Sequence, residues 1–320
     1  MFPSYFILLL TILIFINMKY FIFLAVFCLL AVSCSNENED KVMNQQALVP
    51  VTVSVNDFSI TQGEFPDAPG GTQSTTRATA VGEYNGLKTL TLAFYDGETE
   101  VYKATQLKES MPEGATFGNF SLDLPLGSYT MVVLGYVLYD DDALTLTSPT
   151  QAEYTVNAPR ETFAATQTVN VTSTTALNLS ATLNRIVSQL KVISSDNRTA
   201  NVEKVRMTFT AGGKRFSPTS GLATVNTGFS NTVGIGTAVG ARSGSVSNLF
   251  LDTDEQDIDV TIETLDADGN TVFSTVVHDV PFKRNRITKL TGAIYDVSAS
   301  ATAGSFEVNT EWLDDYSDTF

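Results

Sequence analysis

The first candidate for chemistry is a cysteine, Cys34, that joins an apolar run to an acidic one in the stretch LLAVSCSNENED (29–40). The chain has only two cysteines, Cys28 and Cys34, and both lie within its first tenth. The body of the chain therefore has no thiol nucleophile, disulfide framework or cysteine-based metal site. Cys34 itself fits three roles: part of a membrane span, half of a disulfide, or the target of a covalent modification.

Two apolar runs precede Cys34, at 5–16 and 20–32. Read from Met1, together they exceed the ~20 residues of a membrane-spanning helix. Read from Met18, a lysine follows the methionine, and an apolar core leads through small residues to Cys34, as in an export signal. The segment resembles a bacterial lipoprotein signal, although Ala31 stands where leucine is commonest. We therefore expect a start at Met18, a signal peptide over 1–33 and a lipid on Cys34.

A lipid on Cys34 would decide where the chain resides. The resemblance implies a diacylglycerol on the sulfur, with acyl chains such as palmitate. Each buried methylene contributes ~0.8 kcal/mol, so several chains hold a protein at a membrane essentially permanently. The following SNENEDK is polar and acidic and resembles the export tether of Bacteroidetes surface lipoproteins. We expect a tether over 34–50 and a surface-exposed position on the outer membrane.

The charge balance argues against nucleic acid as a partner. The chain carries 19 Lys and Arg against 35 Asp and Glu, a formal net charge of −16. Binding to phosphates requires clustered cationic side chains.

Catalytic and metal-binding patterns are weak. His278 is the only histidine and lies in a strand pattern, where a surface residue at the end of a strand is expected rather than a catalytic one. The acidic loop 252–260 offers Asp252, Asp254 and Asp257 as calcium ligands, but a solvated acidic edge fits better. The stretch DADGN (266–270) lacks the glutamate of a calcium loop and predicts a hairpin turn. We expect no metal, no cofactor and no enzyme, with a hydrolase built on paired carboxylates as a minor alternative.

The rest of the chain reads as β-strands. Apolar and polar residues alternate with a period of two, and threonine, valine and aromatic residues are abundant. The predicted strands cover 51–55, 87–95, 129–139, 176–183, 202–210 and 258–265.

Turn residues separate these strands. Asp96-Gly97 and Asp268-Gly269 predict tight hairpins, because both pairs tolerate positive φ. The Gly, Pro and Thr-rich stretch 61–86 predicts an exposed loop, and the composition changes again at 157–167. We therefore predict an all-β chain of two tandem antiparallel β-sandwich domains, over 51–162 and 163–320.

Several segments carry a family resemblance. The lipoprotein signal, LNRIVSQLKV (183–192), VPFKRNRITKLTGAIYDV (280–297) and FEVNTEWLDDYSDTF (306–320) resemble the fimbrillin-like subunits of Bacteroidetes type V pili. The resemblance implies two transthyretin-like sandwiches, assembled with other subunits into a surface fibre. It also implies cleavage after an arginine in the loop that follows the first strand. Arg77, followed by Ala78, occupies a comparable position, and an ordinary exposed arginine is the alternative.

Residues near the C-terminus suit a strand donated to a neighbouring subunit. Phe306, Val308 and Trp312 share one face at a two-residue spacing, with Thr310 between them. Such a strand can fill a sandwich that lacks one, by β-augmentation. The open alternative is that 306–312 completes its own C-terminal domain.

Three functions follow from these patterns. The first is a fimbrial structural subunit that polymerises by strand exchange, in the shaft, at the tip or as an anchor that keeps its lipid and first strand. Such a fibre would adhere to host or bacterial surface ligands. The second is a monomeric surface lipoprotein that binds glycans or other ligands, a reading weakened by the single tryptophan. The third is the hydrolase above.

Overall fold

The computed structural model describes residues 47–61, 76–84, 86–137, 144–156, 158–295 and 307–309, and for 57–61, 76–79 and 307–309 it describes the backbone alone. These residues belong to one compact unit, Gln46–Phe320. The predicted signal peptide, Cys34 and most of the tether lie outside the described residues. None of the helices in the described part of the chain has the length and apolar character needed to cross a bilayer.

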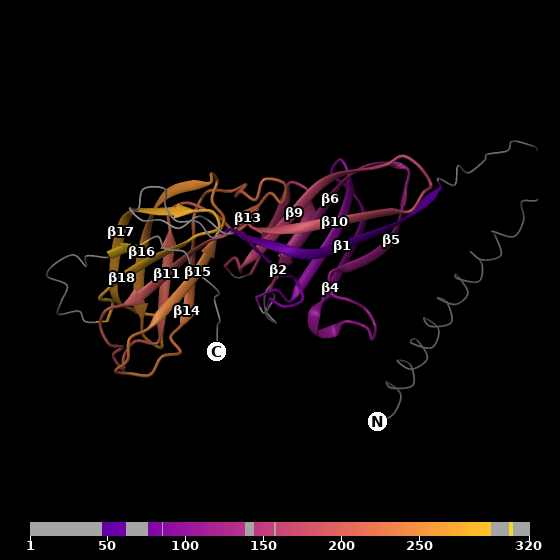
Figure 1. The fold of residues 1–320 in the computed structure, drawn as a ribbon. Helices are drawn as coiled ribbons and strands as arrows, with labels where there is room; N and C mark the ends of the chain where they lie inside the picture. The colour runs from indigo at the N-terminus through magenta and orange to yellow at the C-terminus, as the bar shows by residue number, and fades with distance from the viewer. Residues whose placement is uncertain are drawn as a thin grey trace, which may run out of the picture. The chain divides into compact units, whose positions relative to one another are not determined.

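Strands make up most of the described chain, and the all-β prediction is confirmed. The largest sheet has eight strands in the order β2-β1-β10-β9-β6-β3-β4, with β5 also paired to β1 (Figure 1). Its pairs are antiparallel except for β1 and β10, which run parallel. Its strands are β1 (Leu48–Thr61), β2 (Thr76–Ala80), β3 (Thr89–Asp96), β4 (Thr99–Leu107), β5 (Asn119–Pro125), β6 (Gly127–Tyr136), β9 (Thr162–Val171) and β10 (Leu177–Arg185).

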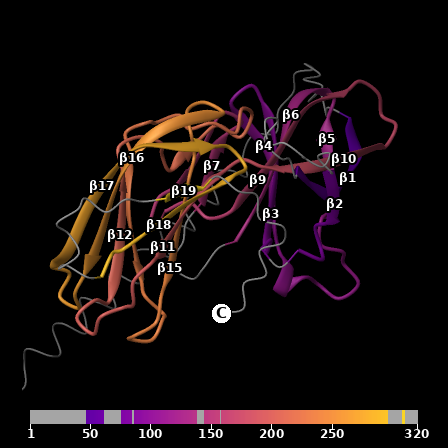
Figure 2. The ribbon, with the colours of Figure 1, turned by 60° about the vertical axis from the view of Figure 1, so that its left-hand side comes forward.

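Two four-stranded sheets follow in the C-terminal part of the chain (Figure 2). One has the order β15-β11-β18-β19, in which β11 and β18 run parallel. The other has the order β14-β12-β16-β17 and is antiparallel throughout. Their strands are β11 (Ser188–Ser194), β12 (Lys204–Phe209), β14 (Phe229–Gly234), β15 (Gly244–Leu249), β16 (Glu255–Leu265), β17 (Thr271–Lys283), β18 (Ile287–Gly292) and β19 (Glu307–Asn309).

Each region has its own apolar core. The alternating residues of the large sheet enclose one core, and the two C-terminal sheets face each other across a second, as in a sandwich. A third core lies under a small sheet of order β13-β8-β7, made of β7 (Leu144–Ser148), β8 (Gln151–Tyr154) and β13 (Arg215–Phe216). There the Phe216 ring stacks on Phe250, with centroids 4.1 Å apart. This third core joins residues from both halves of the chain.

Both predicted hairpin turns are confirmed. β3 turns into β4 at Gly97, and β16 turns into β17 at Gly269. The φ angles of these glycines are 58° and 88°, values that residues with a Cβ rarely adopt.

A side chain of the edge strand β4 reaches the chain at the start of β5. Gln106 of β4 donates from Nε2 to the carbonyl of Asn119, 2.6 Å away, and its Oε1 accepts the N–H of Gly118 at 2.8 Å. The side-chain amide therefore takes the place of a backbone peptide group between β4 and the start of β5.

The predicted division into domains at 162/163 stays a prediction. β9 and β10 pair within the large sheet, and the change to the C-terminal sheets falls between Arg185 and Ser188.

A bulge bends the hairpin of β16 and β17. The register shifts between Ile258 and Val260, and Asp279 on the facing strand has φ 51°. One carboxylate oxygen of Asp259 accepts the Asp279 N–H at 2.9 Å, and the other lies 2.9 Å from Nδ1 of His278, which donates to it. These bonds, the backbone one first, hold the pKa of Asp259 below its usual range.

Acid is expected to loosen this bulge. Because the folded pKa of Asp259 lies below its unfolded value of about 3.9, its contribution to stability is complete above that value and is lost as the pH falls below about 4. When the pH is lowered from about 6 to below about 4, the urea concentration at the unfolding midpoint should fall further in the wild type than in Asp259→Asn. Urea denaturation followed across pH measures this difference. Asp257→Asn is the control, and equal pH dependence of wild type and Asp259→Asn would contradict the assignment.

Candidate functional site

Strand β1 is the element most directly concerned with the predicted strand exchange. It pairs in parallel with β10 on one side and, on the other, with β5 and then β2 (Figure 1). Its apolar residues alternate with polar ones, which places one set of side chains in the core. Val49, Val51, Val53 and Val55 are buried, with at most 1% of their surface exposed.

The partners of these valines come from both neighbouring strands. Leu122 and Leu124 of β5 and Leu183 of β10 belong to the same core. At about 1.5–3 kcal/mol for each buried aliphatic side chain, the four valines contribute about 6–12 kcal/mol, an upper limit. That range is comparable to the whole stability of a typical domain. Removal of β1 would therefore expose an apolar groove between β10 and β5.

The chain around Gly118 marks the point where β1 changes partner. The N–H of Val55 donates to the Gly118 carbonyl at 2.8 Å, and the N–H of Val81 donates to Asn56 at 3.1 Å. Gly118 has φ 98°, and a Cβ there would stand 2.5 Å from the Val55 carbonyl oxygen. Only glycine fits this close approach.

The predicted cleavage position lies in a strand. We expected a loop over 61–86, but Thr76–Ala80 forms β2 and pairs antiparallel with the end of β1. Arg77 stands opposite Ile60, and Ala78 opposite Ser59. The backbone between Arg77 and Ala78 is thus part of a ladder, which must open before a protease can bind it in extended form. Cleavage there stays a prediction.

The predicted donor strand is described only in part. Val308 lies in β19 and stands opposite Leu290 of β18, so 307–309 pair with the chain's own sheet. Phe306, Thr310 and Trp312 lie outside the described residues, as does Cys34. This pairing corresponds to the alternative in which the segment completes its own domain, and the donor role stays a prediction.

The acidic loop before β16 is engaged with neighbouring side chains. Asp252 accepts the amide N–H of Asn226 at 2.6 Å, and Asp254 lies 2.6 Å from the Arg284 guanidinium. Among the described residues, no three His, Cys, Asp or Glu side chains are placed to hold a metal ion. His278 is on β17 with its side chain 69% exposed, within a strand rather than at its end.

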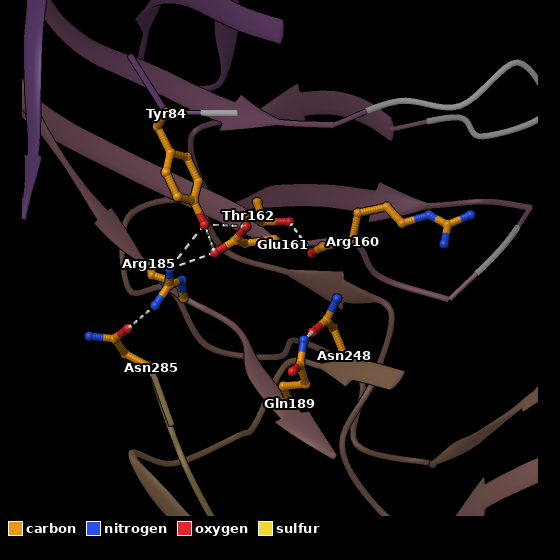
Figure 3. A network of polar contacts seen from close by, with 8 residues as sticks. All are labelled: Tyr84, Arg160, Glu161, Thr162, Arg185, Gln189, Asn248 and Asn285. Atoms are coloured by element: carbon orange, nitrogen blue, oxygen red, sulfur yellow. Dashed lines mark hydrogen bonds and ion pairs between the residues drawn. The ribbon is translucent and has the colours of Figure 1, made fainter. Parts of the chain in front are cut away.

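A polar network that the sequence did not reveal surrounds Arg185 at the end of β10 (Figure 3). Its Nη2 lies 2.6 Å from Glu161, and its Nη1 donates to Oδ1 of Asn285 at 3.2 Å. Tyr84 donates to the same Glu161 carboxylate at 2.8 Å. The Arg185 guanidinium also lies over the Phe163 ring, 5.2 Å from its centroid.

This network connects distant parts of the chain. Tyr84 follows β2, Glu161 precedes β9, and Asn285 lies in the turn between β17 and β18, where its N–H donates to Val187 at 2.9 Å. Burial and the Glu161 carboxylate raise the pKa of Tyr84, which therefore stays a donor. Burial disfavours the charge of Arg185, but Glu161 and Tyr84 outweigh it and raise its pKa. The network thus holds the C-terminal sheets to the large sheet.

One signal in the sequence could have indicated this network. Arg185 stands directly before the apolar pair Ile186-Val187 and is the one charged residue of the segment LNRIV (183–187). A charged residue beside apolar ones is rarely buried without a partner.

Solved structures show weak likeness to this chain. A candidate adhesin of Bacteroides ovatus has a TM-score of 0.47 and 11% identity, covering 87% of this chain and 100% of its own. A candidate polysaccharide-binding protein of Bacteroides thetaiotaomicron has a TM-score of 0.45 and 9% identity, covering 78% and 92%. The fimbrial anchor protein Mfa2 of Porphyromonas gingivalis has a TM-score of 0.45 and 11% identity, covering 82% and 97%. At TM-scores below 0.5, these likenesses decide nothing about function.

The sequence itself gives a firmer result. No curated protein matches it. A family profile described as a family of unknown function, DUF6562, matches residues 57–318. Because this match spans most of the chain, the protein belongs to the DUF6562 family.

Proposed function

We propose that this protein is a structural subunit of a cell-surface fimbrium, exported as a lipoprotein through Cys34 and assembled by β-strand exchange. Its partners would be other fimbrial subunits. Its lipid would place it at the outer membrane, and the assembled fibre would take part in adhesion. The proposal is for a structural and binding function without catalysis.

The observation that carries the proposal is the position of β1. This strand occupies the interior of a sheet, fills its core with four valines, and is followed after 14 residues by β2 with Arg77. Cleavage after Arg77 would leave β1 without a covalent link to the remainder, held only by its pairing and its side chains. Another strand with alternating apolar residues could then take the same place.

An anchor subunit is the second candidate, and two pairings favour it. β2 pairs with β1 around Arg77, and 307–309 pair with β18 of the same chain. Both arrangements describe a chain that keeps its first strand and completes its own sheets.

Limited trypsin treatment distinguishes the two candidates. For an assembling subunit, mass spectrometry should detect a fragment that begins at Ala78, and electron microscopy should then show filaments. Arg77→Ala should remain monomeric under the same treatment, whereas Arg242→Ala, at an arginine in the 235–243 loop, should behave as the wild type. Cleavage at Arg77 that leaves monomers with β1 still bound would contradict strand exchange. A chain that trypsin leaves intact at Arg77 would favour the anchor.

A further inference from the structure

A pocket with a volume of about 210 Å³ lies between the large sheet and β7. Residues of β3, β4 and β6 form one side, and residues of β7 form the other. This volume has room for several water molecules. This is below the ~300 Å³ at which pockets for drug-sized ligands begin. The pocket therefore suits a small molecule or one group of a larger one.

Three hydroxyl groups in the pocket form a chain. Thr91 Oγ1 lies 3.0 Å from Thr105 Oγ1 and 2.9 Å from the hydroxyl of Tyr136. Burial raises the pKa of Tyr136, so its hydroxyl stays protonated. Three hydroxyls carry three hydrogens, and the two bonds use two of them. One hydrogen is left without an acceptor among the described residues, while several oxygen lone pairs remain open.

A lysine adds a second donor. Lys103 of β4 reaches across to β7 and donates to the Leu146 carbonyl at 2.7 Å and to Glu100 at 3.0 Å. An ammonium group has three hydrogens, so one is still available, with no partner among the described residues. Because Glu100 balances the charge of Lys103, the described lining of the pocket is close to neutral.

Thr145 and three leucines complete the described lining. Leu134 and Leu146 are buried, Leu144 is partly buried, and all three line the pocket. None of the lining residues that the structure describes is a carboxylate. The pocket thus places two spare donors and open hydroxyl lone pairs beside a leucine wall.

We propose that this pocket binds the acetamido group of an N-acetylated sugar or similar small neutral amide. The carbonyl oxygen accepts from Lys103 and the hydroxyl chain, the amide N–H donates to a hydroxyl oxygen, and the methyl group contacts the leucines. A neutral amide matches the local charge balance, whereas a carboxylate would compete with Glu100 for Lys103. This site is independent of the proposed strand exchange.

Titration of the full chain with N-acetylglucosamine, followed by NMR of ¹³C-labelled leucine methyls, tests the site. The methyl signals of Leu134, Leu144 and Leu146 should shift in a saturable way, at millimolar concentrations. Glucose and glucosamine, which lack the acetyl group, and acetate, which carries a charge, should shift them little.

Matched variants test the donors. Lys103→Met should weaken binding about tenfold, because hydrogen bonds to charged groups are the stronger kind. Thr105→Val has nearly the same shape and should weaken it a few-fold. Lys88→Met removes a lysine of an exposed ion pair outside the pocket and should leave binding unchanged. Equal shifts with glucose, stronger binding of acetate, or equal losses in Lys88→Met and Lys103→Met would each overturn the proposal.

Discussion

A chain that begins at Ala78 is expected to aggregate or unfold by itself and to recover a soluble monomeric fold when a peptide of residues 47–61 is added. Without β1, the strands β10 and β5 lose their common neighbour, and the core that the four valines fill opens to water. The loss of about 6–12 kcal/mol, again an upper limit, is of the same size as the stability of a domain. Size-exclusion chromatography and circular dichroism, with and without the peptide, measure the recovery.

The peptide's side chains provide the control for this experiment. A peptide with Val51→Asp and Val53→Asp keeps the length and most of the backbone pairing but places two charges in the apolar core, so it should not restore the fold. A chain from Ala78 that is monomeric and fully folded without any peptide would contradict a structural role for β1. It would also remove the main support for strand exchange.

The second large effect is expected at Arg185. Replacement by methionine removes the cation that pairs with Glu161 and the donor to Asn285, and it leaves Glu161 with the Tyr84 hydroxyl alone among the network's donors. The side chains of Arg185 and Glu161 are only 21% and 26% exposed. Breaking a largely buried ion pair in this way costs about 3 kcal/mol. Arg185→Met should therefore lower the free energy of unfolding by about this amount, as measured by urea denaturation.

Two further variants distinguish the loss of the Arg185 network from the loss of a positive charge alone. Arg185→Lys keeps the charge but lacks the planar fork that reaches both Glu161 and Asn285, so it should restore only part of the stability. Lys88→Met breaks an exposed pair with Glu109 and should cost less than about 1 kcal/mol. Equal effects of Arg185→Met and Lys88→Met would show that the network contributes no more than a surface contact.

The elements that could be predicted are those with local signals. Alternation of apolar and polar residues located the strands that became β1, β3, β6, β10, β12 and β16. Asp-Gly pairs located two hairpins because positive φ is a property of a few adjacent residues.

The rest depends on contacts between distant residues. The parallel pairing of β1 with β10 joins segments more than 120 residues apart, and no local pattern indicates it. β2 escaped prediction because TRATA is short and follows a stretch rich in Gly and Pro, so its strand character depends on the end of β1. The Arg185 network draws its members from four separate segments, and only a charge beside the apolar pair Ile186-Val187 gave a sign of it.

The side chain of Gln106 affects whether another protein molecule can pair with this part of the sheet. Strands at the margin of a sheet invite unplanned stacking of one molecule on another, and proteins commonly cover or block them. By bonding to Gly118 and Asn119 with both ends of its amide, Gln106 occupies hydrogen-bonding groups where β4 and β5 would otherwise be open. Pairing of another molecule with this seam is thereby disfavoured.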